Sequence, residues 1–291
     1  MIMSKSFFGN IFNPQGIKIC TPARTGEDQW KYARENIQMV WVDKFVGHER
    51  TDYYLLEKKR LKFGLNGVIQ KPIHSSPFWK GFESKLLILD GHHKREVLPE
   101  NHEIRFLPSF LYDYRDLKMG AWFVSIKRKT HDTAVKMGVD ILECDFEKGR
   151  RLVEEDKAFF MTMKKNGSRI RYRVFMANSG EQVSLGIIEE KQSELLRKLP
   201  ENIHREIEYI PDEETFYGGC IERGDTVLYR RALKYDEVLK RVRRGELFAP
   251  KATRFSGYSP IPKPIEIKFI VELQMYPIEV AEAKMKDYFR K

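Results

Sequence analysis

The chain has 291 residues, of which 42% are hydrophobic and 32% charged, and it carries a formal net charge of +10 at pH 7. This composition excludes a disordered or fibrous chain, and the sequence has no apolar run of about 18 residues that would predict a membrane-spanning helix. The length suits two domains, or one domain with a large second lobe, and the positive charge favours polyanionic partners, either nucleotides or nucleic acid.

The three cysteines, Cys20, Cys144 and Cys220, are widely separated and form no CxxC pair. This pattern argues against a disulfide framework or a zinc ribbon, and it predicts a reducing, cytoplasmic location. The apolar run in residues 1–8 is too short for a secretory signal. Residues 1–35 contain several Gly, Pro and Asn residues that break any periodicity, so we expect them to form an N-terminal extension.

Residues 36–135 predict a first lobe in which strands alternate with short helices, which indicates an α/β core. Its helix is expected at 50–63, ended by Gly64 and Gly67. The expected strands lie at 37–42, from 71 onward, at 86–89, at 104–111 and at 119–126.

Residues 136–291 predict a second, smaller α/β lobe with a C-terminal tail. The turn Lys165-Asn166-Gly167 lies between two apolar runs and predicts a hairpin of 158–163 with 171–176. Further strands are expected at 139–142, 206–210 and 226–230, helices at 132–137, 189–199 and 234–244, and a charged connection at 148–156.

One stretch of the first lobe combines a buried strand with a glycine turn and basic residues. Four aliphatic residues, 86–89, are followed by Asp90-Gly91-His92-His93-Lys94, and a helix is expected to begin within 96–100. A strand, a glycine turn and a helix start gather free backbone N–H groups that bind an anion such as phosphate. The alternative is a tight surface turn with solvated charges.

His48-Glu49 ends the loop that follows the first strand. If this strand and 86–89 are parallel, Glu49 and Asp90 leave the same end of the sheet, where one acid can take a proton from a hydroxyl and the other can orient it or hold a metal. The structural alternative is that Glu49 caps a helix. A zinc cluster of His48, Glu49, His92 and His93 is a weaker interpretation, because adjacent histidines on a turn rarely bind one ion.

The loop Lys251-Ala252-Thr253-Arg254 follows Pro250 and places a hydroxyl between two cations, which suits a carboxylate or a phosphate. The alternative is a basic surface loop. Trp122 either belongs to the core or forms the wall of a ligand pocket.

Three motifs together resemble a known family. Residues 89–94 resemble the DGHHR element of free L-serine kinases with a ParB/sulfiredoxin-like fold. Residues 42–49 are similar to the segment with the catalytic glutamate, and residues 244–254 to the near-C-terminal signature. The motifs occur in the family's order, between about 37 and 257. Lys94 replaces an arginine of the family, and Phe255 stands where archaeal members have histidine.

The resemblance implies a ParB/sulfiredoxin-like first lobe and an active site in the cleft between the lobes. It implies phosphoryl transfer from ADP or ATP, with pyrophosphate as an alternative donor, to free L-serine, giving O-phospho-L-serine. Mg²⁺ would be bound mainly through the donor's phosphates. The implied roles are Glu49 as general base with Asp90 beside it, phosphate binding by Gly91, His92, His93, Lys94 and Arg254, and serine binding by Trp122, Lys251 and Thr253.

Two other functions remain to be compared with this one. A ParB-like DNA-binding nucleotide switch would use the basic charge, but it needs a helix-turn-helix after the first lobe, where a hairpin is predicted. A sulfiredoxin-type reductase needs a reactive cysteine in the phosphate turn, where His92 stands. We therefore expect serine and a nucleotide or pyrophosphate as partners, and neither specific nucleic-acid binding nor a membrane.

Overall fold

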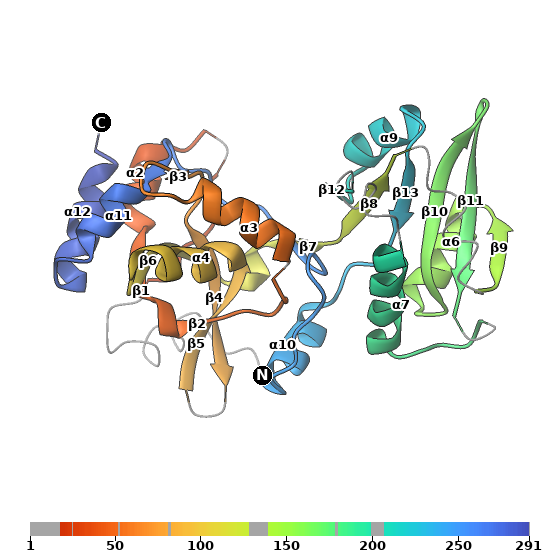
Figure 1. Cartoon of the computed structure of the whole chain (residues 1–291), viewed down its shortest axis with the longest axis horizontal. Helices are drawn as coiled ribbons and strands as arrows, with labels where there is room; N and C mark the ends of the chain where they lie inside the picture. Colours follow the sequence, from red (N-terminus) through yellow and green to blue (C-terminus); the bar gives the residue numbers. More distant parts are fainter. Residues whose placement is uncertain are drawn as a thin grey trace. The chain divides into compact units, whose positions relative to one another are not determined.

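The chain divides into two units, which are described separately (Figure 1). The first comprises the described residues through Lys118, Asp236–Pro250 and those from Phe255 on, and the second comprises Met119–Tyr235 and Lys251–Arg254. The expected boundary at 135/136 therefore falls inside the second unit. A computed structural model describes residues 18–290, except 25, 52, 81–82, 128–138, 178–179 and 199–206.

The first unit is built on a five-stranded mixed sheet in the order β1-β6-β4-β5-β2. Strands β1, β2 and β5 run in one direction and β4 and β6 in the other, as the parallel pairs β2/β5 and β4/β6 and the antiparallel pairs β1/β6 and β4/β5 require. Their bounds are β1 Gln38–Trp41, β2 Phe45–Val46, β4 Ile73–Lys80, β5 Glu83–Asp90 and β6 Phe106–Leu111.

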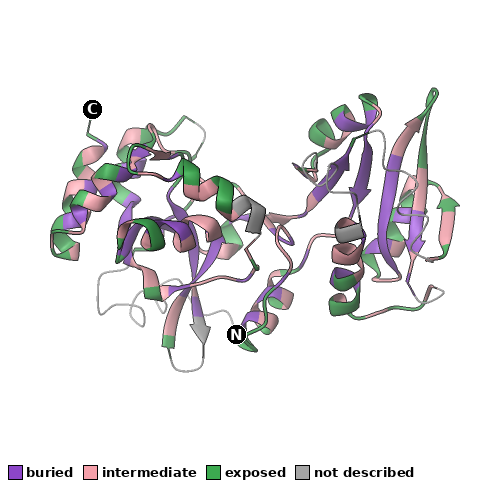
Figure 2. Ribbon diagram, viewed as in Figure 1, coloured by how far each residue is buried: buried purple, intermediate pink, exposed green. Residues whose placement is uncertain are grey.

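The strands predicted at 86–89 and 104–111 are confirmed as β5 and β6. All of β6 is buried, and so are the four aliphatic residues of β5 (Figure 2). A strand buried on both faces needs such a run instead of alternation.

Helices and short elements complete the first unit. The helices are α2 Gln29–Asn36, α3 Tyr53–Lys62, α4 His92–His102, α10 Tyr235–Arg243, α11 Ile267–Leu273 and α12 Ile278–Tyr288, and the 3₁₀ turns are η1 Val42–Lys44 and η2 Tyr114–Asp116. Strands β3 Val68–Ile69 and β15 Ile265–Glu266 pair with each other. Strands β7 Lys118–Gly120 and β14 Arg254–Ser256 lie where the chain passes from one unit to the other.

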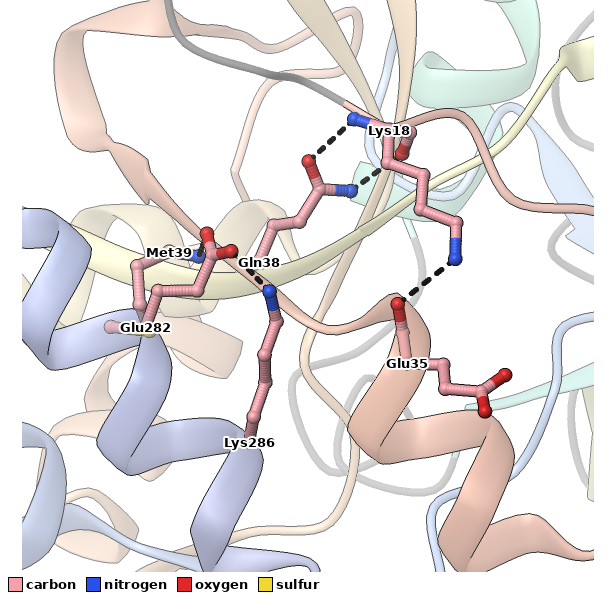
Figure 3. Close-up of polar contacts among 6 residues, drawn as sticks. All are labelled: Lys18, Glu35, Gln38, Met39, Glu282 and Lys286. Carbon is pink, nitrogen blue, oxygen red and sulfur yellow. Dashed lines mark hydrogen bonds and ion pairs between the residues drawn. The ribbon is translucent and has the colours of Figure 1, made fainter.

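The edge strand β1 is covered by segments from both ends of the described chain (Figure 3). The Glu282 carboxylate on α12 accepts the Met39 N–H at 3.1 Å, and Lys286 donates to the same carboxylate at 2.6 Å. The Gln38 side chain accepts the Lys18 N–H and donates to the Lys18 carbonyl, and the Lys18 ammonium donates to the Glu35 carbonyl. The Glu282 carboxylate thereby satisfies a backbone donor that an open sheet edge would expose, and the Gln38 side chain holds the chain at Lys18 beside β1.

The second unit contains a six-stranded sheet in which every neighbouring pair is antiparallel, in the order β12-β8-β13-β10-β11-β9. The strands are β8 Trp122–Ile126, β9 Ile141–Cys144, β10 Ala158–Asn166, β11 Arg169–Met176, β12 Glu208–Pro211 and β13 Thr226–Tyr229. The predicted hairpin of β10 with β11 is confirmed, and its turn contains Gly167 at φ +63°.

Helices cover both faces of this sheet. Val153 of α6 (Phe146–Glu154) and Ile221 of α9 (Glu214–Glu222) pack in one core cluster with Met161. Ile188 and Leu195 of α7 (Leu185–Lys198) pack in another cluster on the opposite face. The unit therefore has a helix layer on each side of one sheet.

In the second unit the sequence predicted a connection at residues 148–156 and a helix at 132–137. The charged connection expected at 148–156 is wrong, because most of it belongs to α6, whose N-terminus is capped by the Asp145 side chain at 2.8 Å from the Lys148 N–H. One face of this charged helix packs against the core through Phe146, Gly149 and Val153. The helix expected at 132–137 lies outside the described residues.

The predicted mixed α/β class is confirmed by these two units. Among the described residues, no helix combines the length and the apolar character needed to cross a bilayer.

The packing of α6 generates a stability prediction. A Cβ at Gly149 would overlap the Sδ of fully buried Met161 and lie 3.1 Å from Val174 Cγ2. Gly149→Ala should therefore lower the free energy of unfolding by about 1–3 kcal/mol, despite the better helix propensity of alanine. Chemical denaturation would measure this.

Gly219 provides the matched control, because it is an exposed glycine in α9 with nothing within 4 Å of its added Cβ. Gly219→Ala should raise the free energy of unfolding by up to about 1 kcal/mol. Equal effects of the two substitutions would contradict the packing of α6 against β10.

Candidate active site

A left-handed glycine joins the buried strand β5 to helix α4. Gly91 has φ +115°, and an added Cβ would lie 3.2 Å from Ile73 Cγ1, so both the backbone angle and the space favour glycine. The predicted strand, glycine turn and helix are confirmed. The helix begins at His92 and not within 96–100, so both histidines and Lys94 belong to its first turn.

The first turn of α4 has features of an anion-binding helix N-terminus. Gly91 has no side chain to cap the helix, and the first turn contains no acidic residue. The N–H groups of Lys94 and Arg95 donate to the Gly91 carbonyl at 3.0 and 3.1 Å. The amides of His92 and His93 precede them in the turn, and the helix dipole favours an anion there. The Lys94 ammonium donates to the Pro72 carbonyl at 3.3 Å.

The Glu49 loop leaves the same end of the sheet as this turn. Strand β2 pairs in parallel with β5, Phe45 opposite Leu86, and Gly47-His48-Glu49 follows it directly. The loop backbone is fixed on both sides of Glu49, because Phe248 N–H donates to the His48 carbonyl at 2.8 Å and Arg50 N–H donates to the Phe248 carbonyl at 2.9 Å. Glu49 thus has a defined backbone position, and its side chain is only 10% exposed.

The His92 imidazole connects the Gly91 turn to the Glu49 loop. His92 Nε2 accepts a long hydrogen bond of 3.4 Å from the His48 N–H, and the two rings meet edge to face with centroids 4.7 Å apart. A Cβ at Gly47 would lie 3.3 Å from His92 Cδ2, so glycine permits this approach. Burial lowers the pKa of His92 to about 3, which keeps the ring neutral and its Nε2 an acceptor.

His48 contacts Glu49 and Phe255 in addition to His92. It is fully buried, its Nε2 lies 3.7 Å from the Glu49 carboxylate, and its ring meets that of Phe255 edge to face at 6.0 Å. Phe255 is the residue that stands in place of the expected histidine. Among the described residues, no group of three or more His, Cys, Asp or Glu side chains is arranged to hold a metal ion, so the zinc interpretation gains no support.

Two of the residues expected to bind serine, Trp122 and Lys251, lie close to Arg254 in the second unit, and Arg254 was expected to bind phosphate. The Lys251 ammonium and the Arg254 guanidinium carbon lie 4.9 and 5.7 Å from the Trp122 ring centroid. Lys251 has φ +60°, an uncommon angle for a residue with a side chain, and Arg230 donates to the Lys251 and Trp122 carbonyls. Thr253 is 5% exposed. Trp122, Lys251 and Arg254 therefore form one cluster.

The two groups of predicted residues belong to different units. Glu49, Asp90 and the Gly91 turn lie in the first, and the Trp122 cluster lies in the second. Their roles in ligand binding, and a serine site in the cleft between the lobes, stay predictions.

Sequence reasoning missed His74 of β4, which is fully buried opposite Asp90 in the β4/β5 register. Its ring stacks on Tyr258 at 4.1 Å and on Tyr112 at 5.6 Å. Neither ring nitrogen has a hydrogen-bond partner among the described residues, and burial lowers its pKa to about 3. A single histidine inside a buried strand gives no periodic signal, so only the three-dimensional structure reveals it.

Known proteins share much of this architecture, although no family model matches the chain. The chain is 26% identical over 236 residues to the ADP-dependent L-serine kinase of Thermococcus kodakarensis, a match that covers 74% of this chain and 84% of that protein. It is 25% identical over 227 residues to the ATP-dependent L-serine kinase of Desulfurococcus mucosus, covering 74% and 83%.

A solved structure of a free serine kinase, a glutamate-to-alanine variant in complex with ADP, superposes with a TM-score of 0.60 at 22% identity, covering 81% of this chain and 94% of that one. The chain has the fold of the free serine kinases. The resemblance to free L-serine kinases that the three motifs indicated is thereby confirmed. The ParB/sulfiredoxin-like description of the first lobe stays a prediction.

The buried His74 of this free serine kinase fold generates a prediction about acid stability. Its pKa is about 3 in the folded protein and about 6.5 when exposed, so between these values the unfolded chain binds more protons. The free energy of unfolding should therefore fall as the pH drops from 6.5 towards 3. His74→Phe removes this contribution and should weaken the loss, as urea unfolding at pH 7 and pH 5 would show.

His92 still titrates in this variant, so part of the acid sensitivity should remain. An unchanged difference in unfolding free energy between pH 7 and pH 5 would show that His74 is not buried in its neutral form.

Proposed function

We propose that the chain is a kinase that transfers the terminal phosphoryl group of a nucleotide, ADP or ATP, to the hydroxyl of free L-serine. The observation that carries this proposal is the parallel pairing of β2 with β5, which places the Glu49 loop and the Gly91 turn at one end of one sheet. The two curated relatives are named as ADP-dependent and ATP-dependent L-serine kinases, and the solved free serine kinase binds ADP, which supports a nucleotide donor.

The donor phosphates would bind at the N-terminus of α4. The Gly91 turn supplies backbone N–H groups and the positive end of the helix dipole, and His92, His93 and Lys94 occupy its first turn. Gly91 matters here because a side chain would strain the left-handed backbone and crowd Ile73 and the Lys94 ammonium. Arg254 would contact the transferring phosphoryl group from its own segment of the chain.

Glu49 would act as the general base. A serine hydroxyl is a weak nucleophile until its proton is removed, and a carboxylate fixed by its backbone can remove it without reorganisation. The hydroxyl proton passes to Glu49, the serine oxygen bonds to the terminal phosphorus, and the bond to the bridging oxygen breaks, which releases AMP from ADP or ADP from ATP. Asp90 would orient the hydroxyl.

The serine itself would bind through the second-unit cluster. Its carboxylate needs cationic or hydroxyl donors, which Lys251 and Thr253 provide, and Trp122 offers an apolar wall that excludes water. With Phe255 in place of histidine, these donors carry the recognition of the carboxylate.

Magnesium fits this site through the phosphates of the donor. The described residues form no cluster of three protein ligands, although Asp90 and Glu49 offer the oxygen atoms that Mg²⁺ prefers. When bound, the ion neutralises the charge of the phosphates.

A DNA-binding switch receives less support. It requires a helix-turn-helix after the first lobe, whereas the described part of the second unit is an antiparallel sheet with helices on both faces. We therefore do not propose specific nucleic-acid binding.

Incubation with Mg²⁺, L-serine and a single donor tests the proposal. Phosphorus NMR and mass spectrometry should detect O-phospho-L-serine with ADP or ATP, together with stoichiometric AMP or ADP. If O-phospho-L-serine forms only with pyrophosphate, then pyrophosphate and not a nucleotide is the donor. Absence of phosphoserine with all three donors would contradict the function.

The assigned base generates a second prediction for the active protein. Glu49→Gln keeps the size and hydrogen bonding of the side chain but cannot accept a proton at neutral pH. It should lower kcat by about 100-fold or more with little change in serine affinity.

Glu57→Gln is a suitable control, since Glu57 is a half-exposed carboxylate on α3 that pairs with Arg60. It should leave kcat unchanged. Near-normal turnover of Glu49→Gln would exclude Glu49 as the base.

A further inference from the structure

Two carboxylates hold the Arg254 guanidinium in the second unit. Arg254 Nη1 donates to Asp212 Oδ1 at 2.9 Å, and Nη2 donates to Glu213 Oε1 at 2.9 Å. The Arg254 side chain is 14% exposed. A guanidinium has five N–H donors, so these two contacts leave three that the described residues do not occupy and that a ligand could use.

The second oxygen of Asp212 is bound to the strand that carries Trp122. Asp212 Oδ2 accepts the Ala121 N–H at 2.9 Å, and Trp122 follows as the first residue of β8. A Cβ at Gly120 would lie 2.7 Å from the same oxygen, so only glycine permits the carboxylate to approach the backbone here. Asp212 itself follows Pro211, which pairs with Trp122 in the β12/β8 register. The carboxylate is therefore fixed by the sheet before it contacts Arg254.

We propose that Asp212 is a positioning residue that fixes the Arg254 guanidinium relative to Trp122 and leaves its remaining donors directed at the ligand. This inference rests on the proposed function, because it assigns Arg254 to the binding of serine or of the transferring phosphoryl group. Physically, an arginine that is ordered before binding loses less rotational freedom when the ligand arrives. Its planar fork also requires a fixed orientation to form two parallel hydrogen bonds.

Glu213 has no equivalent role. Its side chain is 49% exposed against 26% for Asp212, and exposed ion pairs contribute little because water screens them and the side chains remain mobile. Asp212 is distinguished by its second bond to the Ala121 amide. Asp212 and Glu213 can therefore be compared directly, because they bind the same guanidinium but only Asp212 is also held by the backbone.

A double-mutant cycle in the full-length protein tests the proposal. Asp212→Asn keeps an acceptor for Ala121 but loses the charge, and it should lower kcat/KM for serine about tenfold. In an Arg254→Ala or Arg254→Lys background the same change should cause little further loss. Glu213→Gln should have a smaller effect than Asp212→Asn. Glu143→Gln breaks a 2.9 Å pair with Arg173 elsewhere in this unit and should leave the kinetics unchanged.

A purely structural Asp212 would behave differently. Its loss would then lower the melting temperature and kcat/KM equally with and without Arg254, and such additivity would overturn the proposal. An unchanged kcat/KM in Asp212→Asn would do the same.

Nuclear magnetic resonance separates this inference from the proposed function. Exchange spectroscopy of the Arg254 side chain, assigned by loss of the signal in Arg254→Lys, should show slow rotation about the Nε–Cζ bond in the wild-type protein and faster rotation in Asp212→Asn. Fast rotation in the wild type would overturn the positioning role, even if serine is phosphorylated. Slow rotation without serine kinase activity would instead contradict only the proposed function.

Discussion

The left-handed backbone of Gly91 is the constraint on which the candidate site depends. It allows β5 to end and α4 to begin within a single residue, so that the helix N-terminus lies directly at the end of a buried strand. Ile73 packs where a Cβ would stand, which fixes the turn from the side of β4. The same turn directs His92 towards His48, and this contact makes the Glu49 loop and the Gly91 turn parts of one packed structure.

Three histidines pack inside this region of the first unit. His48, His74 and His92 lie inside the first unit, and burial keeps the last two uncharged at neutral pH. A neutral imidazole can accept a hydrogen bond or stack on an aromatic ring without the desolvation cost of a buried charge. If the N-terminus of α4 binds the donor phosphates as proposed, His92 would be a neutral partner there, and the helix dipole and Lys94 would supply positive charge.

The sequence predicted the elements whose pattern is local. The aliphatic run of β5, the glycine turn and the β10/β11 hairpin depend on neighbouring residues, and their positions are confirmed. Local patterns could not predict contacts between residues far apart in the sequence. Asp212 lies 42 residues from Arg254, and His74 faces Asp90 on the neighbouring strand. In α6 the charged residues outnumber the few residues that face the core. Charge alone therefore misassigned a helix as a connection.

The near-C-terminal signature at residues 244–254 contributes to both units, which explains why one short motif contains such different residues. Phe248 forms a parallel bridge with Glu49 and is fully buried, so its apolar side chain and its amide fix the loop of the proposed base. Lys251 adopts a left-handed backbone that Arg230 fixes through its carbonyl, and Arg254 follows with its two acidic partners. The first half of the motif is thus constrained by packing in the first unit, and the second half by polar contacts in the second. A substitution at Phe248 should therefore act on the geometry around Glu49, whereas one at Arg254 should act on the polar contacts of the second unit and on the ligand binding proposed there.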